Sequence, residues 1–177
     1  MSISKITKDL KGHDKDFPPV HLWNPELCEG QEFYIDRQGN WFYNDSPIKN
    51  YKLTKLFSTV IRKDEDEYFL ITPHEKVPLK VELAPYKIID YTFLDNYIRL
   101  STNFDYDFIL NKINTTRLIK DNESSIPIVH VRNNIDGFFD RNTYYNLIEY
   151  ALKNEFIENN SLYVPSHNLI HIIGKIA

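Results

Sequence analysis

The fold is decided by the stretch Ile35-Asp36-Arg37-Gln38-Gly39-Asn40-Trp41-Phe42-Tyr43-Asn44-Asp45-Ser46-Pro47-Ile48. Gly39 is free to take a positive φ angle, so residues 37–40 predict a tight turn between two strands. Trp41 and Tyr43 alternate along the return strand and therefore share one face of it. Ser46 and Pro47 then predict a helix start, because a capping hydroxyl precedes a residue whose φ angle is already fixed. The stretch thus predicts a β-hairpin that leads into a helix.

The segment after this hairpin has the periodicity of an amphipathic helix. Its apolar residues fall at i, i+3, i+4, i+7 and i+8, and they are Leu53, Leu56, Phe57, Val60 and Ile61. Arg62 and Lys63 are expected to lie at the C-terminal end of this helix. The acidic run at residues 64–67 is expected to be a solvated loop rather than a metal site. Residues 68–72 predict a strand, and residues 77–81 predict a second strand that Pro78 confines to an edge or a bulge.

Several short aromatic segments follow, and they are typical of an antiparallel meander. Residues 86–94, 97–101 and 106–110 are separated by Asp, Asn and Thr turns. Residues 120–125 are expected to form a polar loop, residues 126–131 a strand, and residues 133–137 a turn. A second amphipathic helix is predicted next, with its apolar stripe at Tyr144, Leu147, Ile148, Ala151 and Leu152.

Spacing between these segments predicts an internal duplication. The five apolar positions of the second helix are those of the first helix moved by 91 residues, and residues 162–165 match residues 70–73 moved by 92. Residues 169–173 then match residues 77–81. Because helix, strand, proline and following strand all keep step, the pattern favours a repeated unit.

We therefore expect an α+β protein of two small domains, residues 22–85 and 86–177, each an antiparallel sheet that carries one helix. An N-terminal arm, residues 1–21, is expected to precede them. Ile3, Ile6 and Leu10 have the spacing of a short docking helix that ends at Gly12. The prolines between residues 17 and 25 predict an extended segment whose Trp23 packs on a domain.

Composition excludes some classes of protein. The chain has 177 residues, of which 42% are hydrophobic and 26% charged, and its net charge is −4. This charge argues against a nucleic-acid-binding protein, since phosphate binding depends on clustered Lys and Arg. Cys28 has no second cysteine to pair with, and no apolar run approaches a membrane span or a signal sequence. We expect a soluble, cytoplasmic protein.

Sequence motifs of known chemistry are missing. The chain contains no phosphate loop, GxSxG, HExxH or CxxC pattern. His167 and His171 are four residues apart on a predicted strand, which separates them by roughly 13 Å, too far to share one zinc ion. His130 lies in an apolar run and is expected to be a core residue. No cofactor and no metal are therefore expected.

Many of these phrases occur in the same order in one bacterial family. They are Trp23-Asn24-Pro25, residues 28–30, residues 35–39 with Trp41, Ser46-Pro47-Ile48, Leu56-Phe57-Ser58, Thr72-Pro73 with Glu75-Lys76, Val81-Glu82 with Ala84-Pro85, Thr102-Asn103, Pro127 with Val131-Arg132, and Arg141 with Tyr144-Tyr145. Over residues 22–152 the chain resembles the domain of unknown function family DUF1285. The resemblance implies a duplicated two-domain α+β core with a C-terminal part superficially similar to pleckstrin-homology-like folds. It implies no established activity, and it suggests a part in signalling through binding at the domain interface.

Three groups of polar residues predict a binding site. Thr72, His74, Glu75 and Lys76 form a loop directly after a predicted buried strand, where binding residues are often found. Thr102 and Asn103 end another strand with groups that both donate and accept hydrogen bonds, and Arg132 closes an apolar strand. We expect a cleft between the domains to gather these residues, with Trp41 as an aromatic wall. Alternatively, Glu75, Lys76 and Arg132 form a salt-bridge network that only holds the domains together.

Three functions remain open from the sequence. A cytoplasmic module that binds a small anionic ligand or a protein partner is favoured over an enzyme. The second is a hydrolase or transferase whose active site is assembled in the cleft. The third is a structural scaffold, which would need a large exposed apolar patch and no pocket.

Overall fold

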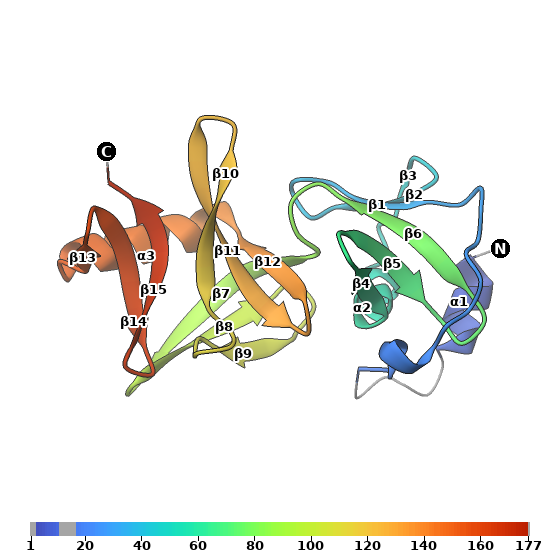
Figure 1. The fold of residues 1–177 in the computed structure, drawn as a ribbon, viewed down its shortest axis with the longest axis horizontal. Helices are drawn as coiled ribbons and strands as arrows, with labels where there is room; N and C mark the ends of the chain where they lie inside the picture. Colours follow the sequence, from blue (N-terminus) through green and yellow to red (C-terminus); the bar gives the residue numbers. More distant parts are fainter. Residues whose placement is uncertain (1–2, 11–16, 177) are drawn as a thin grey trace. The chain divides into compact units, whose positions relative to one another are not determined.

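The computed structural model describes residues 3–10 and 17–176. The chain forms two compact units, Met1–Pro85 and Tyr86–Ala177, called here the N-terminal and C-terminal units. Within the described residues, the strands form two six-stranded sheets and one three-stranded sheet, and helices accompany them in both units (Figure 1). The predicted α+β class is confirmed.

The N-terminal unit contains a six-stranded sheet in the order β3-β2-β1-β6-β5-β4. Its two halves are antiparallel three-stranded meanders that meet where β1 and β6 run parallel, with Tyr34 opposite Lys80. The prediction of a purely antiparallel sheet is therefore wrong at this junction. The strands are β1 (Phe33–Ile35), β2 (Trp41–Tyr43), β3 (Ser46–Pro47), β4 (Ile61–Asp64), β5 (Glu67–Ile71) and β6 (Lys76–Val81).

Helix α2 (Tyr51–Thr59) covers one face of this sheet. Phe57 has no exposed surface, and its ring centroid lies 5.1 Å from that of Phe33 and 6.3 Å from that of Trp41. The ring of Phe57 therefore joins the helix to β1 and β2.

The ends of α2 differ from the prediction. Ser46 and Pro47 pair with β2 as a short strand, and Asn50 caps the helix by accepting a hydrogen bond from Leu53 N at 3.3 Å. An amide side chain fills the capping role that was assigned to Ser46. At the other end, residues 61–64 form β4 instead of continuing the helix, because they pair with β5. Strand pairing outweighs the helical spacing of Ile61 and the dipole argument for Arg62.

The six-stranded sheet of the C-terminal unit repeats the topology of the first, with the order β10-β11-β12-β7-β8-β9. Two antiparallel meanders again meet at a parallel pair, here β12 and β7, with Gly137 opposite Tyr86. The strands are β7 (Tyr86–Leu94), β8 (Tyr97–Thr102), β9 (Asp107–Ile109), β10 (Thr116–Asp121), β11 (Ser124–Arg132) and β12 (Ile135–Phe139).

Two of these strands were not predicted. Strand β10 lies partly in the segment expected to be a polar loop, and β12 occupies most of the expected turn at residues 133–137. All five residues of β12 are buried, and a β-carbon on Gly137 would lie 3.0 Å from Val131 Cγ2 and 3.2 Å from Tyr86 O. This glycine therefore permits close strand contact at the parallel junction.

Helix α3 (Arg141–Lys153) follows β12 and leads to the three-stranded antiparallel sheet β13 (Ile157–Glu158), β14 (Ser161–Ser166) and β15 (Leu169–Lys175). Asp140 caps the helix by accepting a hydrogen bond from Asn142 N at 3.2 Å. Leu147 and Ala151 are buried as predicted, whereas 49% of Leu152 is exposed.

The predicted duplication holds for the order of elements, because α2 and α3 each precede three antiparallel strands. The strands after α2 are half of a six-stranded sheet, whereas those after α3 form a separate sheet. The fuller repeat of topology runs through β1 to β6 and β7 to β12. The likeness to pleckstrin-homology-like folds stays a prediction.

The N-terminal arm is anchored by apolar and polar contacts. Ile6 in helix α1 (Ile3–Asp9) and Leu10 directly after the helix are both buried. The expected helix stop at Gly12 lies outside the described residues. Farther along, η1 (Val20–Leu22) is held by Arg62, whose guanidinium donates to Val20 O at 2.9 Å and to Trp23 O at 2.6 Å. The η1 turn thus packs beside β4.

Phe57→Ala should lower the free energy of unfolding of the N-terminal unit by about 3–5 kcal/mol, because it removes a fully buried ring. Denaturant titration measures the change. Lys52→Ala, on the exposed face of the same helix, should cost less than about 0.5 kcal/mol. Equal losses in the two variants would contradict the orientation of α2.

Candidate functional site

A mismatch between two parallel strands opens a groove in the N-terminal unit. Leu27 pairs with Lys76 and Phe33 with Leu79, so six residue steps on one side face three on the other. The chain between Leu27 and Phe33 must therefore loop away from β6. Gly30 accommodates this with a φ angle of +76°.

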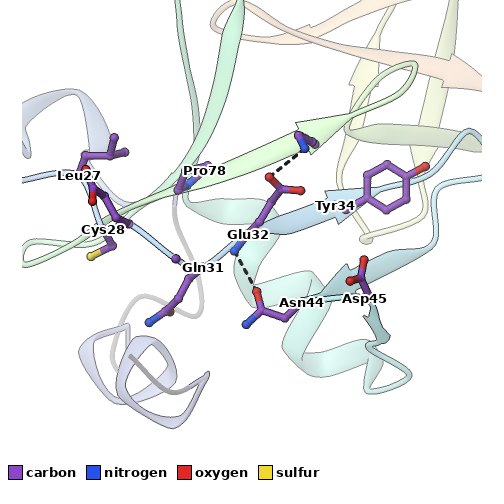
Figure 2. Close-up of a pocket in the computed structure, with 11 residues that line it drawn as sticks. Leu27, Cys28, Gln31, Glu32, Tyr34, Asn44, Asp45 and Pro78 are labelled. Carbon is purple, nitrogen blue, oxygen red and sulfur yellow. Dashed lines mark hydrogen bonds and ion pairs between the residues drawn. The ribbon is translucent and has the colours of Figure 1, made fainter.

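The groove has a volume of about 760 Å³ and lies beside the β2–β3 turn (Figure 2). Its outward-facing residues alternate with the buried Phe33 and Ile35 of β1, so it lies on the face of the sheet opposite α2. The residues that line it are Leu27, Cys28, Glu29, Gly30, Gln31, Glu32, Tyr34, Asn44, Asp45, Pro78 and Lys80.

Hydrogen bonds fix one wall of the groove. Glu32 N donates to Asn44 Oδ1 at 3.1 Å, and Asn44 N donates to Glu32 O at 3.1 Å. Asn44 and Asp45 both have positive φ angles, as the two-residue turn of a hairpin requires. Glu32 Oε2 also lies 3.0 Å from Lys80 Nζ, so that lysine is neutralised by an acid of the groove itself. Glu29 and Asp45 remain as exposed carboxylates, and the lining is acidic.

Tyr34 is held in a neutral, hydrogen-donating form. Its hydroxyl donates to Glu82 Oε1, and Glu82 Oε2 accepts from Arg37 N at 2.8 Å. The hydrogen bond to Glu82, with smaller contributions from burial and from the charges of Glu82 and Asp36, raises the pKa of Tyr34 to about 12. The phenol therefore stays protonated across the physiological pH range.

Most of the site residues predicted for the N-terminal unit have structural contacts. Trp41 is buried in the core, and Thr72 Oγ1 accepts from His74 N at 3.3 Å and from Glu75 N at 3.1 Å. His74 is exposed. The threonine hydroxyl thus caps the start of the predicted loop.

The charged residues of this loop have partners inside the same unit. Glu75 is 7% exposed, its Oε1 lies 3.1 Å from Lys5 Nζ, and its Oε2 accepts no hydrogen bond from any described residue. Lys76 Nζ lies 2.8 Å from Asp64 Oδ2 and 3.9 Å from the centroid of the Phe69 ring.

Asp64 is the centre of the ion-pair network at β4, contrary to the expectation that residues 64–67 are all solvated loop. Arg62 Nε lies 2.8 Å from Asp64 Oδ1, and Lys76 contacts the other oxygen. The hydrogen bond from Arg62, reinforced by Lys76 and only partly opposed by burial, holds the pKa of Asp64 below its ordinary value.

The residues predicted for the C-terminal unit also bond within it. Thr102 Oγ1 accepts from Phe104 N at 3.3 Å and Tyr106 N at 3.2 Å, and Asn103 Oδ1 accepts from Lys87 N at 3.0 Å. Arg132 is 8% exposed, and its Nε donates to the Tyr86 hydroxyl at 2.9 Å. That the eight residues share one cleft stays a prediction.

None of the eight residues lines the groove at Gly30. The available signals for the groove were Pro78 within a strand pattern and the glycine at position 30. Pro78 has no N–H group for strand pairing, and its strand was assigned to an edge or a bulge for that reason. That assignment is wrong, because β6 is a central strand that pairs with both β1 and β5. The loop between Leu27 and Phe33 is the complementary irregularity on the neighbouring chain segment.

The hydroxyl of Thr115 contacts the buried imidazole of His171. Thr115 Oγ1 lies 2.9 Å from His171 Nδ1, and His171 Nε2 lies 3.3 Å from Ser166 O. A carbonyl oxygen only accepts, so Nε2 carries the proton and the threonine donates to Nδ1. His171 is 1% exposed, which closes this pair to a substrate. It is a structural contact between residue 115, just before β10, and β15.

The described residues contain neither a cluster of metal ligands nor a helix that could span a membrane. No three His, Cys, Asp or Glu side chains among them gather as a metal site would require. No helix in the described part of the chain combines the length and the apolar character needed to cross a bilayer.

Both sheet-rich α+β units match the domains of one protein family. The family description "Domain of unknown function (DUF1285), N-terminal domain" matches residues 18–84, and the corresponding C-terminal domain matches residues 85–173. The chain belongs to the DUF1285 family.

Two solved structures of this family are similar to the chain. A DUF1285 family protein from Silicibacter pomeroyi is 26% identical, with a TM-score of 0.83 over 97% of this chain and 95% of that one. Another, from Shewanella baltica, is 28% identical, with a TM-score of 0.55 over 69% of this chain and 94% of that one. No curated protein gives a significant match.

The stability of the C-terminal unit should fall as the pH is lowered below about 6.5, the ordinary pKa of histidine. Burial lowers the pKa of His171, so protonation favours the unfolded chain, where that pKa is normal. The loss should approach about 1.4 kcal/mol per pH unit until the folded pKa is reached.

Denaturant titration between neutral and mildly acidic pH measures this effect. His171→Leu should remove the dependence, whereas His74→Gln, at an exposed position, should retain it. An identical pH dependence in wild type and His171→Leu would show that another group is responsible.

Proposed function

We propose that this protein is a cytoplasmic binding protein that acts in signal transduction by taking up a segment of a protein partner. The observation that carries the proposal is the groove beside Gly30, with its volume of about 760 Å³. That volume lies in the range of ligand-binding sites, and the groove is on a sheet face that α2 leaves open.

Charge favours one of the two expected partners. The carboxylates of Glu29 and Asp45 are exposed, and Lys80 is already paired with Glu32. A small anion entering the groove would meet like charges, whereas a basic segment would meet opposite ones. The proposed partner therefore carries Lys or Arg side chains.

The walls of the groove are already ordered. The two hydrogen bonds between Glu32 and Asn44 fix the turn, and the ring of Tyr34 lies 5.6 Å from that of Phe42. Binding to an ordered surface loses less conformational entropy than binding to a loop that must fold. Tyr34 would offer an aromatic surface to a cationic side chain.

Short peptides that differ only in charge test the proposal. Calorimetry should detect binding of a peptide that alternates Lys and Thr. A peptide with Gln in place of Lys should bind at least about tenfold more weakly, and a peptide with Glu in place of Lys should not bind. Added salt should weaken the binding of the basic peptide, because the carboxylates of the groove are exposed and salt screens their charge.

A double variant supplies the site control. Glu29→Gln with Asp45→Asn removes charge while keeping shape, and Asn tolerates the positive φ angle at position 45. It should lower the affinity for the basic peptide severalfold, whereas Glu65→Gln with Asp66→Asn should not. If phosphate binds instead, and Lys76→Ala or Arg132→Ala abolishes it, the anion site predicted from the sequence is correct and the groove proposal fails.

A further inference from the structure

A second cavity lies in the C-terminal unit and is independent of the groove. Its volume is about 290 Å³, and it lies between the tip of the β7–β8 hairpin and the tip of the β14–β15 hairpin. The lining residues that matter to its chemistry are Phe93, Asp95, Asn96, Tyr97, Tyr150 and Asn168. This size suits a small head group rather than a drug-sized molecule.

Aromatic residues from two ring pairs line the cavity. The centroids of Phe93 and Tyr150 are 4.1 Å apart, and Tyr97 stacks on His167 with centroids 5.3 Å apart and planes at 13°. Although Phe93 is a large apolar residue, 41% of it is exposed. A ligand would cover this ring surface.

The two hairpin tips are held rigidly together. His167 N donates to Asn96 O at 2.8 Å. Beneath them, the buried Ser166 Oγ accepts from Ile98 N at 2.9 Å and donates to Leu110 O at 2.6 Å. These bonds connect the six-stranded sheet to the three-stranded sheet, so the cavity is formed before any ligand binds.

The surroundings of the cavity are negative. Asp95 is an exposed carboxylate in its lining. The pKa of the nearby Tyr91 is raised, first by burial and then by the charges of Asp90 and Glu149. The ring of Tyr91 lies 5.1 Å from that of Phe93. An anion is therefore disfavoured here, and a cation would be attracted.

We propose that this cavity binds an alkylammonium group, which packs on Phe93, Tyr97 and Tyr150 with Asp95 as its counter-ion. Aromatic faces attract organic cations through their quadrupoles, and quaternary ammonium groups are the ligands that sites of this composition recognise. The head group can belong to a free amine such as choline or to a methylated lysine side chain. Asn96 and Asn168 at the rim supply amides for the polar remainder of the ligand.

Choline and its neutral analogue dimethylbutanol, in which carbon replaces the ammonium nitrogen, test the role of charge. In an NMR titration of the full chain, choline should shift the resonances of residues 93–98 and saturate. Dimethylbutanol should bind at least about tenfold more weakly, because it has the same shape without the cation. Equal affinities would reduce the cavity to an apolar pocket and overturn the proposal, and so would a failure of choline to bind.

Two substitutions locate the binding. Asp95→Asn and Tyr97→Leu should each weaken choline binding severalfold. Asp107→Asn, at an exposed position on the same sheet, should leave choline binding unchanged. Unchanged binding in Asp95→Asn and Tyr97→Leu would overturn the assignment, provided that their spectra show the native fold. A trimethyllysine peptide that binds more tightly than choline would identify a protein as the source of the head group, and the reverse order would identify a free amine.

Discussion

Both units depend on a parallel strand pair at the centre of their six-stranded sheet. β1 pairs with β6 and β7 with β12, and in each sheet these are the first and last strands in chain order. In the N-terminal unit the chain runs from β1 out to one edge of the sheet at β3, and it must return across a face to continue at the opposite edge, β4. In the N-terminal unit, α2 lies on this return path, and Phe57 packs it against the sheet. The parallel pair therefore determines where the helix and both meanders lie.

Among the described residues, the groove lies at one of the two parallel junctions, and the strand pairing explains why. In the C-terminal unit the junction is tight, because even a β-carbon on Gly137 would lie too close to Val131 and Tyr86. In the N-terminal unit the extra residues before Phe33 interrupt the approach to β6, opposite a proline that could not have donated a hydrogen bond. The groove is thus a consequence of strand register. Glu29 lies on the segment that pairing leaves outside the sheet, and Asp45 lies on the neighbouring β2–β3 turn.

Local features were predictable from the sequence, whereas long-range pairing was not. The buried Phe57 and Leu147 follow from helical spacing, and the end of strand β5 just before Thr72-Pro73 follows from the proline. Strand β12 was missed because Ile135 and Gly137 sit among turn-forming residues, and only pairing with β7 and β11 makes them a strand. For the site, Lys76 and Arg132 were expected to bind a ligand or to join Glu75 in a salt-bridge network. Lys76 instead contacts Asp64, and Arg132 donates to Tyr86. Sequence patterns do not reveal such partners, because they lie far away along the chain.

Amide hydrogen exchange across β1 and β6 tests the central claim most directly. The account predicts slow exchange for the paired residues of β1 and for Leu79 to Val81 on β6, because the two strands pair at the centre of the sheet. It predicts much faster exchange at Gly30 and Gln31, which lie in the segment that leaves the sheet. Uniformly slow exchange from Cys28 to Ile35 would mean that the strand pairs without interruption, and it would contradict both the register mismatch and the groove.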